Sequence, residues 1–340
     1  MRETILQTHQ LSIGYRAPRR PDFKVADTLN LSLQRGELVC LLGPNGVGKS
    51  TLMRTIAGMQ APLAGHVTID HMNITDINPR ALATHLSVVL TDRPNVGLLN
   101  GYALVALGRY PHTNWTGRLS AYDEAVIRWA VDAVGAADLA ERPVMELSDG
   151  QRQKFMVARA LAQEAKLILL DEPTAYLDLP RRAEIMQVLR QVAEQTGRAI
   201  LLSTHDLDLA LRTADTLWLM AEGSIHVGTP EDLVISGVFE RAFQGEGVVF
   251  DRATGAFGME KSPGQTVQVR GNGTPHIWTR RALQRAGYTL AANGTHTPMQ
   301  IEVYGSEYQP VWHLYRHGEC SEHHNIADLL AALSETGVSA

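Results

Sequence analysis

The sequence lacks the features that mark a secreted, membrane-spanning or nucleic-acid-binding chain. Its 340 residues hold two cysteines, Cys40 and Cys320, which lie far apart and make no disulfide framework, so we expect a reducing compartment. No apolar run reaches the ~18 residues that span a bilayer, and the N-terminus lacks the uninterrupted apolar core of a signal peptide. The net charge is -5 without a basic run, so we do not expect nucleic acid as a partner. We therefore expect a cytoplasmic protein that meets a membrane only through another protein.

A glycine-rich stretch, Gly43-Pro-Asn-Gly-Val-Gly-Lys-Ser-Thr51, matches the pattern G-x-x-x-x-G-K-[ST] at every fixed position. Its glycines let successive backbone N–H groups turn toward phosphate oxygens, while Lys49 brings a positive charge and Ser50 a hydroxyl for Mg²⁺. The apolar run 37–42 predicts a buried parallel strand before the loop, and a helix is expected from Lys49 to about Ala57. Strand, loop and helix together favour a nucleoside triphosphate site over a structural turn that merely contains lysine and serine.

Two carboxylates follow the most apolar strand that the sequence predicts, Leu167 to Leu170. Ligands of an open parallel sheet bind beyond the carboxyl ends of its strands, which places Asp171 and Glu172 beside the phosphates. We expect Asp171 to hold Mg²⁺ and Glu172 to deprotonate the attacking water. The plainer alternative is a strand that ends in solvated acids.

A histidine follows a further apolar strand, Ala199 to Thr204. Such a histidine is more often structural than functional. If its strand neighbours the other two, however, the ring of His205 can reach the γ-phosphate.

The remaining pattern outlines the domain around these strands. Residues Thr4 to Tyr15 predict an edge strand, and Val25 to Leu33 predict a second strand. A mainly helical insertion, over about 96–165, is expected between the strand Leu86 to Leu90 and the acidic strand. Its helices are expected at Tyr102 to Leu107, Ala121 to Val134, Ala136 to Ala140 and Asp149 to Gln163.

The segment Leu147-Ser-Asp-Gly-Gln151 resembles the signature Leu-Ser-Gly-Gly-Gln of ABC transporters, with Asp149 in place of the first glycine. Five further elements follow the family's order: an aromatic after the first strand (Tyr15), the phosphate loop (Gly43 to Thr51), the acidic strand end (Asp171, Glu172), Tyr176-Leu-Asp178 resembling the D-loop, and His205 resembling the switch histidine. The resemblance covers about Thr4 to Phe243.

This resemblance implies an α/β fold, a P-loop NTPase of ABC type with a mixed sheet core and a helical subdomain, over residues 1–246. It implies a head-to-tail homodimer that closes on two ATP molecules with Mg²⁺, and hydrolysis that drives a membrane permease. Its nucleotide-binding residues would be Tyr15, stacked on adenine, with Gly43, Pro44, Asn45, Gly46, Gly48, Lys49, Ser50 and Thr51. The second subunit would contribute Ser148, Asp149, Gly150, Gln151 and Asp178 in trans.

A narrower likeness points to the ATP-binding subunits of importers for iron(III)-siderophores, haem or cobalamin. It is carried by Pro44 to Gly48, by Leu104-Val-Ala-Leu-Gly-Arg-Tyr-Pro111 and by Ser203 to Asp208. It implies a permease and, through it, a periplasmic or extracellular substrate-binding protein, with this chain on the inner face of the cell membrane. Two alternatives fit the same core motifs, a soluble ABC-type ATPase without a permease and the ATPase subunit of an exporter.

One position departs from the family. After the strand Leu86 to Leu90, ABC proteins usually have a glutamine that reaches Mg²⁺, and this chain has Thr91 and Asp92 there. Either side chain can bring an oxygen to the ion, directly or through water. The alternative is that this loop only contacts the permease.

The tail, 247–340, predicts a small α+β domain with a hairpin at Val248 to Phe257. Further strands are expected at Val267 to Arg270, Met299 to Tyr304 and Val311 to Tyr315, and helices at Trp278 to Ala286 and Asn325 to Leu333. We interpret the tail as a regulatory or dimerising domain, or else as a packing extension. Its metal-like side chains, on a strand and a following loop, fit no standard zinc spacing: His313, His317, Cys320, His323 and His324.

Overall fold

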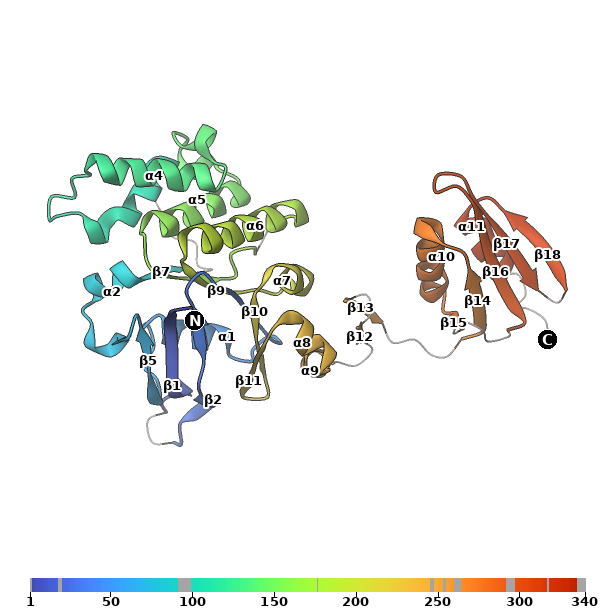
Figure 1. Cartoon of the computed structure of the whole chain (residues 1–340), viewed down its shortest axis with the longest axis horizontal. Helices are drawn as coiled ribbons and strands as arrows, with labels where there is room; N and C mark the ends of the chain where they lie inside the picture. The colour runs from blue at the N-terminus through green and yellow to red at the C-terminus, as the bar shows by residue number, and fades with distance from the viewer. Residues whose placement is uncertain are drawn as a thin grey trace. The chain divides into compact units, whose positions relative to one another are not determined.

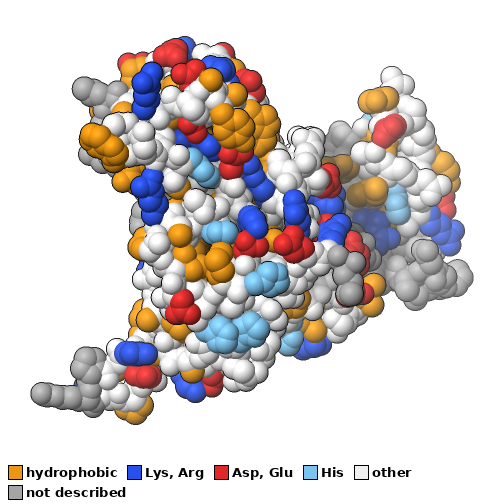
Figure 2. All heavy atoms as spheres, turned by 60° about the vertical axis from the view of Figure 1, so that its left-hand side comes forward, with side chains coloured by type: hydrophobic (Ala, Val, Ile, Leu, Met, Phe, Trp, Pro, Cys, Tyr) orange, Lys and Arg blue, Asp and Glu red, His pale blue; other side chains and the backbone are white. Residues whose placement is uncertain are grey.

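The computed structural model describes residues 2–17, 20–90, 99–175, 177–244, 248–252, 255–259, 264–291, 297–316 and 318–334 (Figure 1). The chain divides into two compact units, 1–244 with 250–256, and 245–249 with 257–340. Within the described residues, no helix combines the length and the apolar character needed to cross a membrane. On the face drawn in Figure 2, acidic and basic side chains are interspersed and are not gathered by sign.

The central sheet of the first unit has the strand order β11-β10-β4-β9-β8-β7. Its strands are β4 (Leu38–Leu42), β7 (Leu86–Val89), β8 (Leu167–Asp171), β9 (Ala199–Ser203), β10 (Thr216–Ala221) and β11 (Ser224–Gly228), and all are parallel except β11. Every residue of β4, β8 and β9 is buried, as continuous apolar runs in a sheet covered on both faces should be. The carboxyl ends of these three strands are therefore neighbours.

Alternate residues of β4 enter two different cores because successive side chains of a strand point to opposite faces. Leu38, Cys40 and Leu42 pack with α5 (Asp149–Ala162) and α6 (Leu179–Thr196). Val39 and Leu41 pack with α1 (Lys49–Ile56) and the second sheet. Figure 1 shows α5 and α6 on one side of the central sheet, and α1 with the second sheet on the other.

The second sheet has the order β2-β1-β5-β6, with β3 also paired to β1. Its strands are β1 (Thr4–Tyr15), β2 (Phe23–Leu29), β3 (Ser32–Gln34), β5 (Ala64–Ile69) and β6 (Met72–Asn73). The prediction that β1 is an edge strand is wrong, since β2 and β3 pair on one side of it and β5 on the other. The predicted strand Val25 to Leu33 is split because the Thr8 hydroxyl donates to the Leu29 carbonyl (3.0 Å) and accepts from the Leu31 N–H (2.8 Å).

Between β7 and β8, the described residues 99–166 are mainly helical, as expected. They comprise α3 (Gly101–Ala106), the 3-10 helix η2 (Leu107–His112), α4 (Ala121–Ala133), the 3-10 helices η3 (Ala137–Leu139) and η4 (Val144–Glu146), and α5. The helix expected over Ala136 to Ala140 is only the single turn η3. Besides α1 and α6, the described helices elsewhere in this unit are η1 (Ile74–Asp76), α2 (Pro79–His85), α7 (Leu207–Thr213), α8 (Pro230–Ile235) and α9 (Val238–Ala242).

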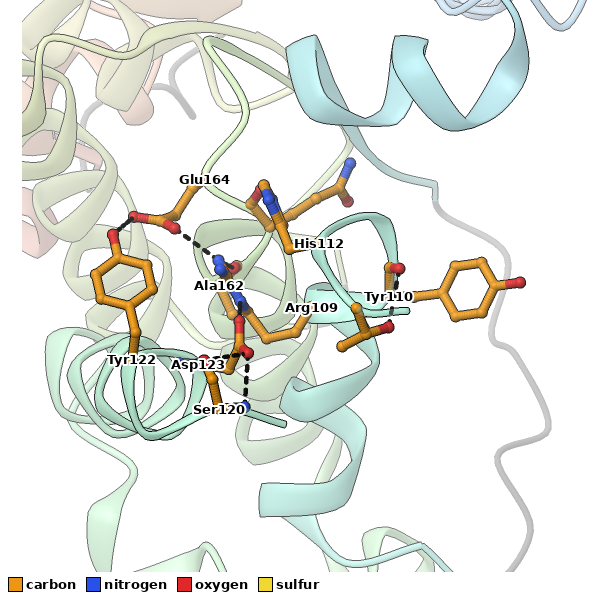
Figure 3. A network of polar contacts seen from close by, with 10 residues as sticks. Arg109, Tyr110, His112, Ser120, Tyr122, Asp123, Ala162 and Glu164 are labelled. Atoms are coloured by element: carbon orange, nitrogen blue, oxygen red, sulfur yellow. Dashed lines mark hydrogen bonds and ion pairs between the residues drawn. The ribbon is translucent and has the colours of Figure 1, made fainter. Parts of the chain in front are cut away.

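A buried arginine connects separate segments of the helical subdomain through hydrogen bonds (Figure 3). The side chain of Arg109 in η2 is 2% exposed and donates to Asp123 Oδ1 (2.8 Å), the Ala162 carbonyl (2.8 Å) and Glu164 Oε2 (2.7 Å). Burial raises the pKa of Asp123, but hydrogen bonds from Ser120 and the contact with Arg109 outweigh it and lower that pKa to about 2. Arg109 thus joins η2 to α4 and to the end of α5.

The second unit has its own sheet, in the order β15-β14-β16-β17-β18. Its elements are β14 (Thr266–Arg270), α10 (Gly273–Arg285), β15 (Thr289–Leu290), β16 (Met299–Gly305), β17 (Pro310–Arg316), β18 (Glu319–His323) and α11 (Ile326–Ser334). Both helices pack on the sheet through a core that includes Val267, Leu283, Ile301, Leu314 and Leu329. Trp312 extends this core and donates from its Nε1 to Thr279 Oγ1 at 2.5 Å.

The histidine-rich segment of this unit forms a strand that the sequence did not reveal. We expected a loop after β17, but Cys320 and His323 belong to β18, which pairs with β17. His313 and His324 both approach Glu322, at 3.4 and 3.3 Å. His317 lies outside the described residues, and among those described no three His, Cys, Asp or Glu side chains gather to hold a metal ion.

The hairpin of β12 (Val248–Asp251) and β13 (Ala256–Met259) contacts α9 of the first unit. Phe250 is buried, and its ring centroid lies 5.0 Å from that of Phe239 in α9. Arg252 also pairs with Glu240 of α9. The core of the first unit therefore extends to Phe250.

We expect a chain that ends at Gly245 to be less stable than one that ends at Met259, by about 3 kcal/mol, because it lacks the buried Phe250 ring. Urea denaturation of both shortened chains measures the difference, with Phe250→Ala in the full chain as a matched control. Equal midpoints for the two shortened chains would contradict this role of Phe250.

We expect Arg109→Met to lower the free energy of unfolding by about 3–5 kcal/mol, because it leaves the buried Asp123 carboxylate without its cation. Arg128→Met, which removes an exposed arginine of α4, should change the free energy of unfolding by less than about 0.5 kcal/mol.

In the parent chain, the stabilisation that depends on ionised Asp123 is present above pH ~4 and is lost as the pH falls toward 2, since its pKa is lowered on folding. Urea denaturation as a function of pH checks both statements, and equal stability of the two variants would refute the role of Arg109.

Candidate functional site

The phosphate loop joins β4 to α1 in a conformation that needs glycine at two positions. Gly43 has φ +152°, and a Cβ there would lie 2.3 Å from the Met220 carbonyl oxygen. Gly48 has φ +115°, and a Cβ there would lie 2.1 Å from Val25 Cγ1. The loop can therefore pack closely against β10 and β2 only with glycine at both places.

Lys49 is 7% exposed, and its Nζ donates to the carbonyls of Gly43 (2.8 Å) and Pro44 (3.0 Å). Burial lowers the pKa of Lys49, and the charges of Glu172 and Asp171 oppose that change. The remaining loop residues Pro44, Asn45, Gly46 and Ser50 are on the surface. The ammonium group thus closes the loop on itself and lies in the field of both carboxylates.

The acidic strand end and the histidine strand meet at a buried serine. Asp171 is 9% exposed, and its Oδ1 accepts from Ser203 Oγ at 2.6 Å. The same hydroxyl accepts from the backbone N–H of Glu172 at 3.0 Å. Ser203 therefore fixes the Asp171 carboxylate and the Glu172 backbone together.

Glu172 has φ +52°, a left-handed conformation that is strained for a residue with a long side chain. Its Oε1 lies 2.8 Å from His205 Nε2. As the sequence analysis required, β9 lies between β4 and β8, so His205 belongs to the same cluster as Lys49, Asp171 and Glu172. The cluster offers a carboxylate base, a histidine partner and a cation beside a glycine-rich loop.

Tyr15 ends β1 beside the first helix. Its hydroxyl lies 3.0 Å from the Thr51 hydroxyl, and its ring is half exposed. An exposed aromatic face next to the loop is suited to stacking on a nucleobase.

The signature residues form a second group, at the start of α5. Ser148 caps the helix, since its Oγ accepts from the Gln151 N–H at 3.3 Å while Gln151 Oε1 accepts from the Ser148 N–H at 3.0 Å. Asp149 begins the helix, and Asp178 caps α6 through the Arg181 N–H at 3.1 Å. Tyr176, Thr91 and Asp92 lie outside the described residues, so the structure says nothing of their predicted roles.

The sequence analysis predicted no role for the side chains of two residues in these groups, Ser203 and Arg181. Ser203 could have been noticed as a polar side chain that ends an otherwise apolar strand. Arg181, whose guanidinium lies beside Ser148 and Gly150, carries no such signal, because surface arginines on helices are common.

Comparison with protein families assigns both parts of the chain. Residues 26–175 match the family described as ABC transporter. Residues 264–334 match the family described as iron ABC transporter C-terminal domain.

Individual relatives are also described as ATP-binding proteins of transport systems. An ABC transporter ATP-binding protein of Methanocaldococcus jannaschii is 39% identical over 260 residues, which is 76% of this chain and 88% of the relative. The iron(3+)-hydroxamate import ATP-binding protein FhuC of Bacillus subtilis is 37% identical over 240 residues, 70% of this chain and 87% of the relative.

A solved structure resembles the same region. The ATP-binding cassette MJ0796, a dimer in a post-hydrolysis state bound to ADP and Pi, aligns with a TM-score of 0.58 and 25% identity, over 66% of this chain and 99% of the other. Fold, motif order and relatives agree, and the chain belongs to the ABC transporter family of ATP-binding proteins.

Proposed function

We propose that this chain is the ATP-hydrolysing subunit that powers an ABC importer of iron(III)-siderophores. The observation that carries the ATPase part is the cluster of Lys49, Asp171, Glu172 and His205 at adjacent strand ends, held by Ser203. The match of the tail to an iron ABC transporter C-terminal domain supports an iron compound ahead of cobalamin. The similarity to FhuC, an iron(3+)-hydroxamate import protein, supports a siderophore ahead of haem.

The triphosphate binds on the loop Gly43 to Thr51, and Tyr15 stacks on the adenine. Loop N–H groups and the N-terminal end of α1 contact the phosphates, while Lys49 exchanges its two carbonyl contacts for phosphate oxygens. The cost of burying the lysine is thereby offset by a counter-charge in the bound state.

Mg²⁺ fits two oxygen donors at this place, the exposed Ser50 hydroxyl and the Asp171 carboxylate, whose Oδ1 accepts from Ser203. Thr91 or Asp92 would supply a further oxygen in place of the family's usual glutamine. When bound, the ion draws charge from the transferred phosphoryl group.

Glu172 acts as the general base toward the attacking water. Its carboxylate is oriented by His205, and its backbone is held by Ser203. His205 also comes within reach of the γ-phosphate once the nucleotide is bound.

Two copies close head to tail on two ATP molecules, as the dimer of the related cassette supports. Ser148, Asp149, Gly150, Gln151 and Asp178 of one copy complete the site of the other. Closure and reopening move the permease that holds this subunit on the inner face of the membrane, and a periplasmic or extracellular binding protein delivers the substrate. Residues 1–246 form the ATPase domain, with the segment around Phe250 packed on it, and the rest of 247–340 serves regulation or dimer contacts.

We expect Glu172→Gln to bind ATP but to lower kcat at least about 100-fold, because the amide keeps the shape of the side chain and cannot take a proton. The variant should also shift from monomer to dimer on addition of ATP and not of ADP. Phosphate release and size-exclusion chromatography measure the two effects, with Glu124→Gln as an exposed control. Near-normal turnover in Glu172→Gln would remove Glu172 from the catalytic role.

We expect Ser203→Ala to raise the Mg²⁺ concentration at half-maximal hydrolysis and to lower kcat about tenfold, because Asp171 and the Glu172 N–H lose their shared partner. Ser87→Ala is the matched control, since Ser87 is equally buried in β7 and bonds Gln163 instead. A merely structural serine would change the stability in urea and leave the Mg²⁺ dependence as it is. That result for Ser203→Ala would contradict its positioning role.

A further inference from the structure

Arg181 stands in the first turn of α6, where it joins the two segments assigned to the trans half of the site. Its Nη1 lies 3.5 Å from Ser148 Oγ in the signature. Its Nε lies 3.8 Å from Asp178 Oδ2 at the helix cap. One guanidinium thus lies between the signature and the D-loop.

Gly150 shows how closely this arginine covers the signature. A Cβ on Gly150 would lie 2.9 Å from Arg181 Nη1, 3.1 Å from Arg181 Cδ and 3.3 Å from Leu177 Cδ2. The arginine side chain therefore occupies the space that a side chain at position 150 would need. Its position is set by packing as well as by charge.

The Arg181 guanidinium can donate further hydrogen bonds. It carries five N–H groups, and in the described part of the chain its side-chain polar contacts are at 3.5 and 3.8 Å, which is long for a hydrogen bond. The side chain is 47% exposed. A further anion can approach it without breaking a short contact.

The signature of this chain brings a charge that the usual glycine does not. Asp149 is the first residue of α5, so it adds a negative charge to the helix end that faces the trans phosphate in the proposed function. Two unit charges 4 Å apart repel by about 1 kcal/mol in water and about 4 kcal/mol at the effective dielectric of a protein surface. A cation at this place offsets that repulsion, and a planar guanidinium suits phosphate oxygens.

We propose that Arg181 contacts the γ-phosphate of the ATP held by the second copy, and that it offsets the charge that Asp149 brings to the signature. This inference rests on the proposed function, because it needs the ATP-closed dimer. It adds a phosphate-binding residue outside the six family motifs.

A double-mutant cycle tests this, in the full chain with Glu172→Gln to prevent turnover. The dissociation constant of the ATP-dependent dimer is measured by sedimentation for the parent, Arg181→Ala, Asp149→Gly and the double variant. Arg181→Ala should weaken the dimer at least about tenfold. In the Asp149→Gly background the same change should cost about threefold, because the phosphate contact is still lost but there is no Asp149 charge to offset. Arg181→Lys, which keeps the charge and loses the fork, should fall between the parent and Arg181→Ala.

Arg128→Ala, which removes an exposed arginine paired with Glu124, should leave dimerisation unchanged and controls for net charge. Unfolding in urea checks that each variant is folded. An unchanged dimer in Arg181→Ala, or a loss of equal size with and without the Asp149→Gly change, would overturn the inference and leave the proposed function intact. A Glu172→Gln parent that stays monomeric with ATP would overturn both.

Discussion

The register of three parallel strands sets the distances on which the whole site depends. Ser203 is paired with Leu41 of β4 on one side and with Asp171 of β8 on the other. This pairing places the serine hydroxyl on the carboxylate, and it lets the loops after all three strands start at the same level. A shift of one residue would turn each side chain to the opposite face and would place Asp171 in an apolar core. The apolar runs on these strands therefore serve the chemistry by fixing their register.

Much of this site could be predicted because its chemistry needs particular residue types at short spacing. The phosphate loop and the acids after β8 are local patterns, and the helical insertion follows from periodicity. The contacts that hold them are distant in sequence. The pairing of β1 with β5, the link of Thr8 to Leu29 and Leu31, and the bond of Ser203 to Asp171 each join segments that no local pattern connects.

Arg109 shows how a motif used for recognition can have a structural cause. It belongs to the segment Leu104 to Pro111 that suggested a type of importer, yet its side chain is buried and holds three parts of the helical subdomain. A buried arginine with several acceptors tolerates little change, because an uncharged substitute leaves the buried Asp123 carboxylate without its cation. In the tail, by contrast, the aliphatic residues and Trp312 explain the fold, but their pattern predicts no function.

In the proposed function, the left-handed backbone at Glu172 makes one position costly for stability and necessary for activity. Glycine would relieve the strain there, and asparagine would reduce it, but neither provides a carboxylate beside His205. Selection for heat resistance alone would therefore favour replacing Glu172 and, in the proposed function, would give an inactive enzyme. If Glu172 is the proposed base, its strained conformation is a structural cost that hydrolysis requires.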